Sequence, residues 1–170
     1  MAYLIDSDVL ITAKNRYYGF DICPGFWDAL LRHHEQGALF SLDRVRQELL
    51  AGRDEDELVQ WASQVTPADF YLSTHEANVA NSFTEVMLWA QQNPQFYDAA
   101  KAKFATGADG WLVAYARVHG HTIVTNEQPR PQARNEIKLP DACVQFGVEF
   151  QDTFAMLKAL RVQFGLIEGG

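Results

Sequence analysis

The sequence predicts an α/β fold in which a short parallel sheet is covered by helices on both faces. Short apolar segments such as Tyr3-Leu4-Ile5 alternate with longer segments whose apolar residues recur every three or four positions. The chain has 170 residues, of which 48% are hydrophobic and 21% charged, a balance typical of a globular protein. We therefore expect residues 1–170 to form a single domain.

The first part of the chain predicts two strands and three helices. Ser7 or Asp8 is suited to cap the first helix, and Pro24 suits the first turn of the second. Ser41 or Asp43 is suited to cap the third helix. In chain order, the predicted elements are a strand over 2–6, a helix over 9–14, a helix from 24 to about 37, a strand over 38–40 and a helix over 43–52.

The middle of the chain, about residues 53–105, predicts a helical insertion. The segments 54–65 and 73–93 both carry apolar residues three and four positions apart. Ser73 and Glu76 match the capping-box pattern for the second of them. Pro94 then suits the start of a further short helix through Phe104.

The last part of the chain returns to strands that alternate with helices. The helix over 108–120 has an expected apolar face of Trp111, Tyr115 and Val118. After it, the pattern predicts a strand over 121–125, a polar loop, a brief strand over 137–139, a small helix from 140, a strand over 148–150 and a closing helix over 151–164.

Charge and cysteine content limit the class of function. The formal net charge of −8 argues against a non-specific nucleic-acid binder, whose affinity comes mainly from Lys and Arg. It is compatible with an enzyme whose acidic site carries divalent cations, because the cations reverse the local charge. Cys23 and Cys143 lie far apart without a CxxC spacing, which favours a reduced, cytoplasmic location. With no signal-peptide pattern and no apolar run of membrane-spanning length, we expect no membrane association.

Four acidic residues are predicted at one edge of the sheet. In an open parallel sheet, ligands bind beyond the carboxyl ends of the strands. One of the four ends the first strand, and the others follow later strands or begin a late helix. Each alone also fits a local role, as a helix cap or a solvated surface charge. The four are Asp6, Glu48, Asp109 and Glu127.

Carboxylates that converge on one place predict a divalent cation. Their mutual repulsion would cost stability unless a cation lay among them. Ligand sets made only of oxygen favour Mg²⁺ or Mn²⁺, and Mg²⁺ keeps several waters that leave room for a phosphate oxygen and an attacking water. Two such ions about 4 Å apart would hold both oxygens of a phosphodiester displacement.

Four segments resemble the motifs of PIN domains. YLIDSDVLI resembles their opening motif, and VRQELL, ADGWLVAYARVHG and IVTNE resemble the second, third and fourth. Their order and rough spacing match across nearly the whole chain. KNRYYGFDICPGFWDAL resembles the signature of a PIN-like branch related to the VapC toxins of bacterial toxin–antitoxin pairs.

The resemblance implies a PIN-like three-layer α/β/α sandwich and a metal-dependent ribonuclease whose metal ligands are Asp6, Glu48, Asp109 and Glu127. Asp8 stands where the family usually has Asn, which makes it an additional candidate ligand, and Glu127 stands where the family usually has Asp. Asp141 is an alternative to Glu127, and Ser7 and Thr125 are candidate supporting residues.

Several partners are implied by the same resemblance. The substrate would be RNA, with a cognate antitoxin and a homodimer as protein partners. Basic residues on loops near the predicted site are candidates to hold the RNA backbone, although each also fits a solvated surface charge. They are Lys14, Arg16, Arg130 and Arg134.

Two other functions remain open from the sequence. A haloacid-dehalogenase-type phosphatase would use an Asp-x-Asp pair after a buried strand, with Asp6 as nucleophile and Asp8 as acid and base. Leu10 occupies a position where such enzymes expect Thr or Val, and the late acidic pair is missing. A non-catalytic PIN-like interaction module is the third interpretation, and the charge of −8 suits a basic partner.

Overall fold

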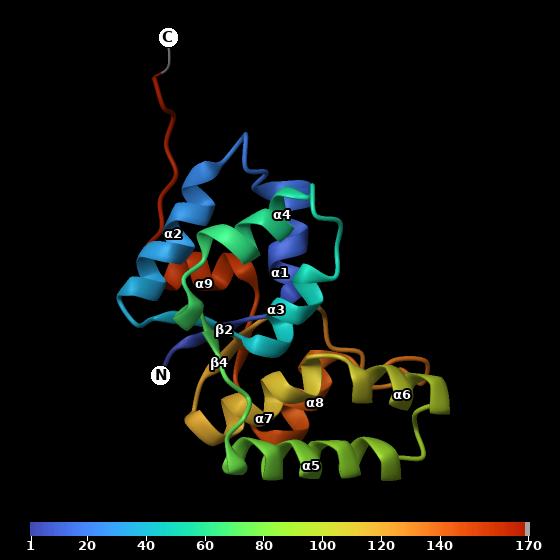
Figure 1. Cartoon of the computed structure of the whole chain (residues 1–170). Coiled ribbons are helices and arrows are strands. Elements are labelled where there is room, and N and C mark those ends of the chain that lie inside the picture. The colour runs from blue at the N-terminus through green and yellow to red at the C-terminus, as the bar shows by residue number, and fades with distance from the viewer. Residues whose placement is uncertain (169–170) are drawn as a thin grey trace.

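A five-stranded parallel sheet forms the centre of the fold. The computed structural model describes residues 1–168, and its strands follow the order β3-β2-β1-β4-β5 (Figure 1). All four neighbouring pairs are parallel, which confirms the predicted fold class. The strands are β1 (Tyr3–Ile5), β2 (Leu39–Leu42), β3 (Tyr71–Leu72), β4 (Thr122–Val124) and β5 (Phe150–Gln151).

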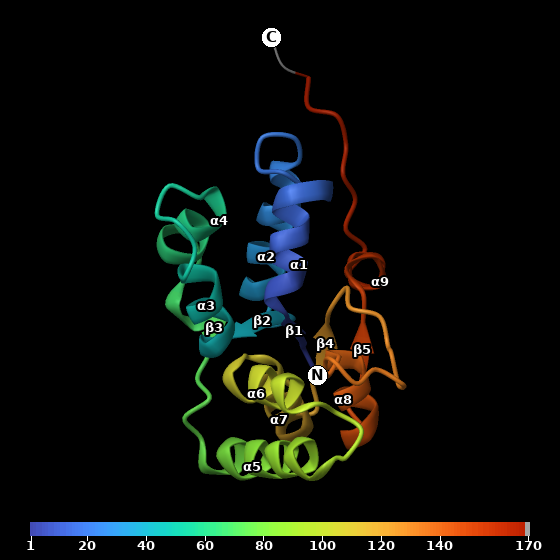
Figure 2. The same ribbon diagram turned by 90° about the vertical axis from the view of Figure 1, so that its right-hand side faces the viewer.

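Helices cover both faces of the sheet, so the structure has three layers (Figure 2). On one face lie α1 (Ser7–Thr12), α2 (Pro24–Glu35) and α9 (Thr153–Ala159). The other face is covered by α7 (Asp109–His119) and α8 (Leu139–Phe146), with α5 (Ala77–Gln92) and α6 (Asp98–Thr106) packed against α7. Near β3 at the edge of the sheet lie α3 (Asp43–Leu50) and α4 (Glu57–Gln60).

The segment 53–105 is more than a helical insertion, because it supplies β3. Phe70 is fully buried at the end of a 3₁₀ turn, and Tyr71 then pairs with Ser41 of β2. A strand of two residues is too short to show an alternating pattern, which is why the sequence did not reveal it. The short helix predicted from Pro94 through Phe104 is present as α6, but it begins later, at Asp98 after a turn.

Several predicted caps differ from the structure. α1 begins directly after Asp6, so Ser7 and Asp8 lie in its first turn and cap nothing. Ser41 lies within β2. The capping box of Ser73 and Glu76 does not form, because the Ser73 hydroxyl accepts a bond from the His75 N–H instead.

Three predicted elements in the chain have different bounds in the structure. The predicted strand over 137–139 is wrong, since α8 begins at Leu139, and the predicted closing helix is shorter, ending at Ala159. Part of the predicted 15–21 loop is a π-helical turn over 13–17.

The predicted apolar face of α7 is only partly correct. Tyr115 is buried, but Trp111 is half-buried and Val118 is exposed. The helix instead buries residues on most of its circumference, because it lies between the sheet, α5 and α8. A helix surrounded in this way has no single apolar stripe for periodicity to reveal.

Two further expectations bear on the location of the protein. Cys23 and Cys143 are both free thiols. Within residues 1–168, every helix is too short or too polar to cross a lipid bilayer. The cytoplasmic location itself stays a prediction.

A buried hydroxyl joins the first two strands and leads to a testable prediction. The Ser41 O–H donates to the Ile5 carbonyl at 2.7 Å, and Ser41 has no exposed surface. Replacing Ser41 with Ala would leave that carbonyl without its partner, so we expect a loss of about 1–3 kcal/mol in the free energy of unfolding, measured by urea titration. Ser63→Ala removes an exposed hydroxyl bonded to Gln60 and serves as the control, with an expected change below about 0.5 kcal/mol. Equal effects of the two substitutions would contradict the prediction.

Candidate metal centre at the carboxyl ends of β1 and β4

The strand order changes direction between β1 and β4, which makes this the topological switch point of the sheet. From β1 the chain continues to β2 and β3 on one side, whereas β4 and β5 extend the sheet on the other. In open parallel sheets such a reversal opens a crevice at the carboxyl ends of the two central strands, where ligands bind. Asp6 follows β1 directly and Thr125 follows β4 directly, so both lie at this crevice.

Asp6 is a buried carboxylate that the neighbouring strand holds in place. Its side chain is 3% exposed, and its backbone N–H donates to the Val124 carbonyl at 3.0 Å. Its carboxylate accepts a bond from the Thr125 hydroxyl at 3.1 Å. The end of the β1–β4 ladder therefore fixes both the backbone and the side chain of Asp6.

Asp8 lies in the first turn of α1, and its carboxylate faces the same hydroxyl. Its carboxylate accepts bonds from the Asn126 backbone N–H at 2.9 Å and from the Thr125 hydroxyl at 3.3 Å. A hydroxyl has one hydrogen, so Thr125 can donate to Asp6 or to Asp8 but not to both at once. Asp6 and Asp8 therefore compete for the single hydroxyl hydrogen of Thr125.

Glu48 reaches the site from α3 with both oxygens bonded. One oxygen accepts the Ala108 backbone N–H at 2.8 Å, and the other accepts the Ser7 hydroxyl at 2.8 Å. Ala108 immediately precedes Asp109, so Glu48 joins α3 to the start of α7. These bonds hold Glu48 at the site although the residue is exposed.

Glu127 and Asp109 complete the group of five carboxylates. Glu127 accepts the Leu139 backbone N–H at 2.9 Å, at the start of α8. Asp109 is the first residue of α7 and is half-buried, and no protein donor bonds its carboxylate within residues 1–168. Of the five, Asp109 is therefore the acid with most free acceptor capacity.

The five carboxylates influence each other electrostatically. Burial, followed by the charges of Glu127, Glu48 and Asp8, raises the pKa of Asp109 to about 7, while the nearby Lys103 acts in the opposite direction. Burial and the charges of Asp109, Asp8 and Glu127 hold the pKa of Asp6 well above its ordinary value. These shifts indicate a shared acidic environment.

A buried thiol lies behind the acidic group. Cys143 of α8 has no exposed surface. Burial and the charges of Asp109, Asp6 and Glu127 raise its pKa to about 12. The thiol is therefore protonated at neutral pH and is a poor nucleophile and metal ligand in that state.

A pocket of about 200 Å³ opens onto three of the carboxylates. Its lining combines the acids with the basic side chain of Lys103 and with part of the loop before α8. The lining residues are Glu48, Asp109, Glu127, Ala100, Lys103, Phe104, Gly107, Glu136 and Ile137.

The donor set suits a hard divalent cation, but its present spacing does not form a closed cage. Carboxylate oxygens are the ligands that Mg²⁺ and Mn²⁺ prefer, and the repulsion that raises the pKa of Asp109 is what a cation would relieve. Within residues 1–168, however, no three His, Cys, Asp or Glu side chains are grouped closely enough to hold a metal ion. Protein donors occupy oxygens of the other four acids, so binding would compete with those hydrogen bonds.

The predicted RNA-binding residues mostly have protein partners. Lys14 pairs with Asp56 at 3.0 Å, Arg130 contacts Glu136 at 3.4 Å, and the Arg134 guanidinium lies 5.1 Å from the centre of the Tyr97 ring. Arg16 is exposed on the π-helical turn after α1. Asp141, the alternative to Glu127, accepts the Arg130 backbone N–H at 2.8 Å and does not line the pocket.

Sequence reasoning missed two charged residues of the pocket, Lys103 and Glu136. Lys103 lies on α6, two turns before Asp109, and Glu136 lies in the loop before α8. Both were in segments interpreted as insertion or loop. Lys103 lies five residues before the ADGWLVAYARVHG motif, whereas Glu136 lies nine residues after IVTNE and carries no signal of its own.

Comparison with known proteins assigns the chain to a family but adds no activity. The model of a family described as "Domain of unknown function (DUF4411)" matches residues 3–164. No curated protein matches the chain. The matched range contains all five strands and all five carboxylates. The likeness to PIN domains therefore rests on the four motifs and on the parallel fold, which is compatible with it.

Proposed function

The chain belongs to the DUF4411 family, and we propose that it is a metal-dependent endoribonuclease that acts as the toxin of a type II toxin–antitoxin pair. The observation that carries the proposal is the convergence of Asp6 and Asp109 at the reversal point of the sheet. These residues are 103 positions apart, yet the charge of Asp109 raises the pKa of Asp6, and the charges of both residues raise the pKa of the Cys143 thiol. A divalent cation at such a site suits phosphodiester hydrolysis.

The chain's own residues have distinct roles in this proposal. Asp109 is the ligand with free acceptor capacity, and Asp6 is the buried ligand that Thr125 orients. Glu48, bonded to Ser7 and Ala108, holds the start of α7 against α3. A bound cation would polarise a water and offset the negative charge of the phosphate. The water oxygen would form a bond to phosphorus as the bond to the 3′ oxygen breaks, which leaves 5′-phosphate and 3′-hydroxyl ends.

The end groups of the products give a direct test. The purified chain is incubated with a pool of 20-nucleotide RNAs of random sequence, in Mn²⁺, in Mg²⁺ or in EDTA, and the fragments are sequenced and their termini identified. We expect cleavage only with a divalent cation and products with 5′-phosphate ends. Metal-independent cleavage that leaves 2′,3′-cyclic phosphates would identify a contaminating ribonuclease. Absence of any cation-dependent cleavage of the pool would contradict the proposal.

Ser7 is expected to act as a positioning residue through Glu48. Replacing it with Ala removes the 2.8 Å bond to Glu48, so we expect cleavage to fall about 10-fold, within the range typical of residues that orient metal ligands. Ser7→Thr keeps a hydroxyl and is expected to restore most of the rate. Thermal unfolding of both variants checks that the fold is retained. If Ser7→Thr were as slow as Ser7→Ala, the lost hydroxyl would not explain the effect.

A phosphatase that uses Asp6 and Asp8 has weaker support. The Asp8 carboxylate accepts bonds from Thr12 and Asn126, so its oxygens are engaged rather than free to transfer a proton. Burial also favours the neutral form of Asp6, which is a poor nucleophile. Comparing the native chain with Asp6→Asn on p-nitrophenyl phosphate separates this alternative from ribonuclease activity.

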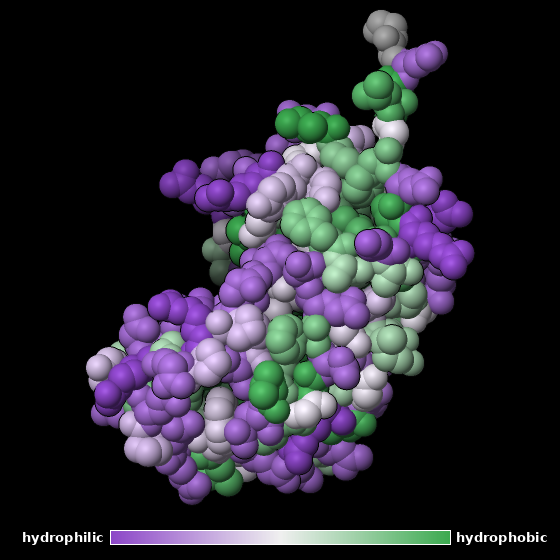
Figure 3. All heavy atoms as spheres, turned by 180° about the vertical axis from the view of Figure 1, so that it is seen from behind, coloured by the Kyte–Doolittle hydropathy of each residue, from purple (hydrophilic) through white to green (hydrophobic). Residues whose placement is uncertain are grey.

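As part of the same toxin–antitoxin assignment, we propose that the chain binds a cognate antitoxin and forms a homodimer. The C-terminal segment leaves α9 and runs along α2, and it carries the exposed apolar side chains Leu166 and Ile167 (Figure 3). Exposed apolar residues at one end of a chain favour contact with another protein. Sedimentation of the chain and of a Leu166→Ser, Ile167→Ser variant tests whether this segment carries the dimer. An interaction module without catalysis would dimerise but leave RNA intact.

A further inference from the structure

We propose that Lys103, Lys138 and Arg130 form a subsite for a backbone phosphate of single-stranded RNA, and that the Glu136 carboxylate occupies this subsite when RNA is absent. The inference rests on the proposed ribonuclease function and names where its substrate is held. It also assigns Glu136 an inhibitory role, because a substrate phosphate must displace its carboxylate.

The geometry places one acid among three cations. The Glu136 Oε1 atom lies 3.0 Å from the Lys138 ammonium and 3.4 Å from the Arg130 guanidinium. Lys103 lines the same pocket as Glu136 and has no carboxylate within 4.0 Å among the described residues. Its charge still acts on Glu136, since the lowered pKa of Glu136 comes first from the bond to Lys138 and then from the charges of Lys138, Arg130 and Lys103.

Lys103, Lys138 and Arg130 carry three positive charges, and the Glu136 carboxylate offsets only one of them. Two cations, Lys138 and Arg130, lie within 4.0 Å of the Glu136 carboxylate, and the charge of Lys103 also acts on it, although the adjoining pocket is acidic. A phosphodiester offers more than one acceptor oxygen and forms strong bonds to Arg and Lys. The pair with Arg130 is exposed on the arginine side and contributes only about 0–1 kcal/mol, whereas the pair with Lys138, whose side chains are 20% and 28% exposed, is the main contact that a phosphate must displace.

The subsite adjoins the proposed catalytic carboxylates. Glu136 and Lys103 line the pocket together with Glu48, Asp109 and Glu127. An RNA strand with one phosphate at the carboxylates would therefore place a neighbouring phosphate toward the three cations. This position favours a continuous nucleic-acid strand over an isolated phosphate ion.

Hydrogen bonds to backbone carbonyls connect the loop that contains Arg130 to the turn before α6. The Gln95 side-chain amide donates to the Pro131 and Ala133 carbonyls, each at 2.7 Å, and the Tyr97 N–H donates to the Arg134 carbonyl at 2.9 Å. These bonds tie the turn before α6 to the loop that contains Arg130. The turn before α6 and the loop that contains Arg130 therefore form one connected surface beside the pocket, which Lys103 and Glu136 line.

RNA binding in a cleavage-deficient background tests the inference. All variants carry Asp109→Asn, and fluorescence anisotropy of a labelled 20-nucleotide RNA pool is measured in EDTA at several salt concentrations. Glu136→Gln is expected to bind RNA about 3- to 10-fold more tightly, whereas Lys103→Ala and Lys138→Ala bind it more weakly. Each lost phosphate contact is expected to reduce the slope of log K against log salt by about 0.7.

Matched controls are available on neighbouring helices. Lys101→Ala changes a lysine of the same helix α6 that bonds the Gln91 carbonyl away from the pocket. Glu85→Gln changes an ion-paired acid of α5, whose partner is Arg117. If Glu136→Gln, Lys103→Ala and Lys138→Ala had no larger effects than these controls, or if no variant bound RNA, the subsite would be refuted.

The outcome separates the subsite from the ribonuclease proposal. Effects on RNA binding without Mn²⁺-dependent cleavage by the native chain would support the subsite and refute the nuclease. Cleavage by the native chain with unchanged binding in the variants would refute the subsite alone. If Glu136→Gln gained affinity for a poly-glutamate peptide but not for RNA, the cations would serve an acidic protein segment, and the RNA assignment would be wrong.

Discussion

Replacing Asp109 with Asn is expected to abolish Mn²⁺-dependent cleavage of RNA while the protein stays folded. The carboxylate of Asp109 has no protein donor within the described residues, so its loss removes a metal ligand without breaking a hydrogen bond of the fold. Changes to residues that only orient metal ligands cost about 10–100-fold. Loss of a ligand itself is therefore expected to reduce cleavage by at least about 100-fold.

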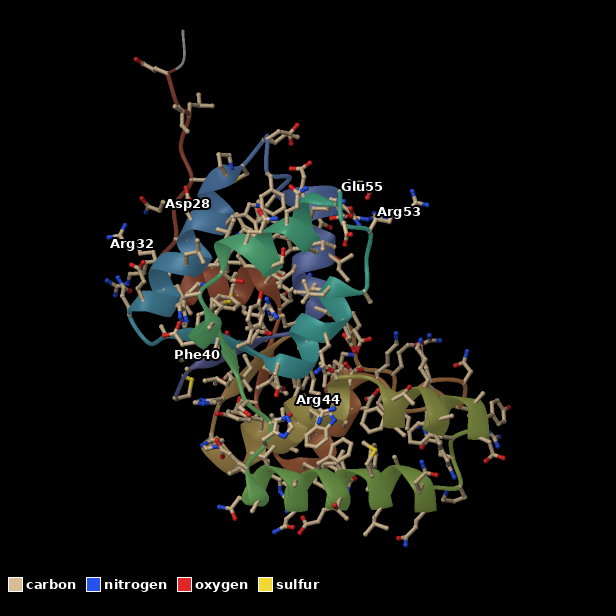
Figure 4. The ribbon with its side chains drawn as sticks, viewed as in Figure 1. Asp28, Arg32, Phe40, Arg44, Arg53 and Glu55 are labelled. Atoms are coloured by element: carbon tan, nitrogen blue, oxygen red, sulfur yellow. The ribbon has the colours of Figure 1, made fainter. Side chains whose placement is uncertain are left out.

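Asp6→Asn is expected to have the same effect on cleavage, and growth inhibition in cells should disappear with either variant. The matched control is Asp28→Asn, which makes the same chemical change at an exposed residue of α2 that lines a different pocket (Figure 4). Circular dichroism and thermal unfolding report whether each variant is folded. Full activity in either Asp109→Asn or Asp6→Asn would overturn the assignment of that residue as a ligand.

The stability of the metal-free protein is expected to fall as the pH rises from 5.5 to 8. The pKa of Asp109 is about 7 in the folded protein and near 3.8 when the chain is unfolded, and the pKa of Asp6 is raised in the same direction. Between these values the folded state binds more protons than the unfolded state, so stability decreases with rising pH. We expect a decrease of at least about 1 kcal/mol, or roughly 2–4 °C in Tm.

Two comparisons isolate the contribution of the acidic group. His121 has a lowered pKa, which by itself makes the protein less stable below pH 6.5, so the native chain is compared with Asp109→Asn across the same range. The Asp109→Asn variant should show a flatter dependence of stability on pH and a higher Tm than the native chain at pH 8. Identical pH profiles of the native chain and of Asp109→Asn would show that the Asp109 carboxylate does not cause the loss of stability at high pH.

Added Mn²⁺ provides the second comparison. It should restore stability to the native chain at pH 8, by about 2.7 kcal/mol at 100 times its Kd, and should do much less for Asp109→Asn.

The sequence allowed the meeting place of the carboxylates to be predicted, because it follows from strand ends. Asp6 comes directly after an apolar run, and once that run is a central parallel strand its last residue must lie at the carboxyl edge of the sheet. Glu127 follows the other central strand by the same logic. Asp109 and Glu48 came from motif order, and the structure places both on the pocket.

Other features depend on tertiary contacts that local patterns do not encode. In the sequence Glu48 also fits a solvated surface charge, and only the fold brings Ser7 and the Ala108 N–H to its oxygens. The strand at Tyr71 is set by pairing with β2 rather than by its own pattern. Arg44 extends from α3 so that its guanidinium lies 4.5 Å from the centre of the Trp111 ring, a contact between distant parts of the chain (Figure 4).

The central position of β1 has a consequence for the timing of activity during synthesis. Asp6 emerges first from the ribosome, but its strand and hydroxyl partners on β4 and at Thr125 are translated more than 100 residues later. A growing chain therefore lacks the contacts that fix Asp6 until the final third of the chain has emerged. If the proposed hydrolase is correct, its site would be complete only late in synthesis.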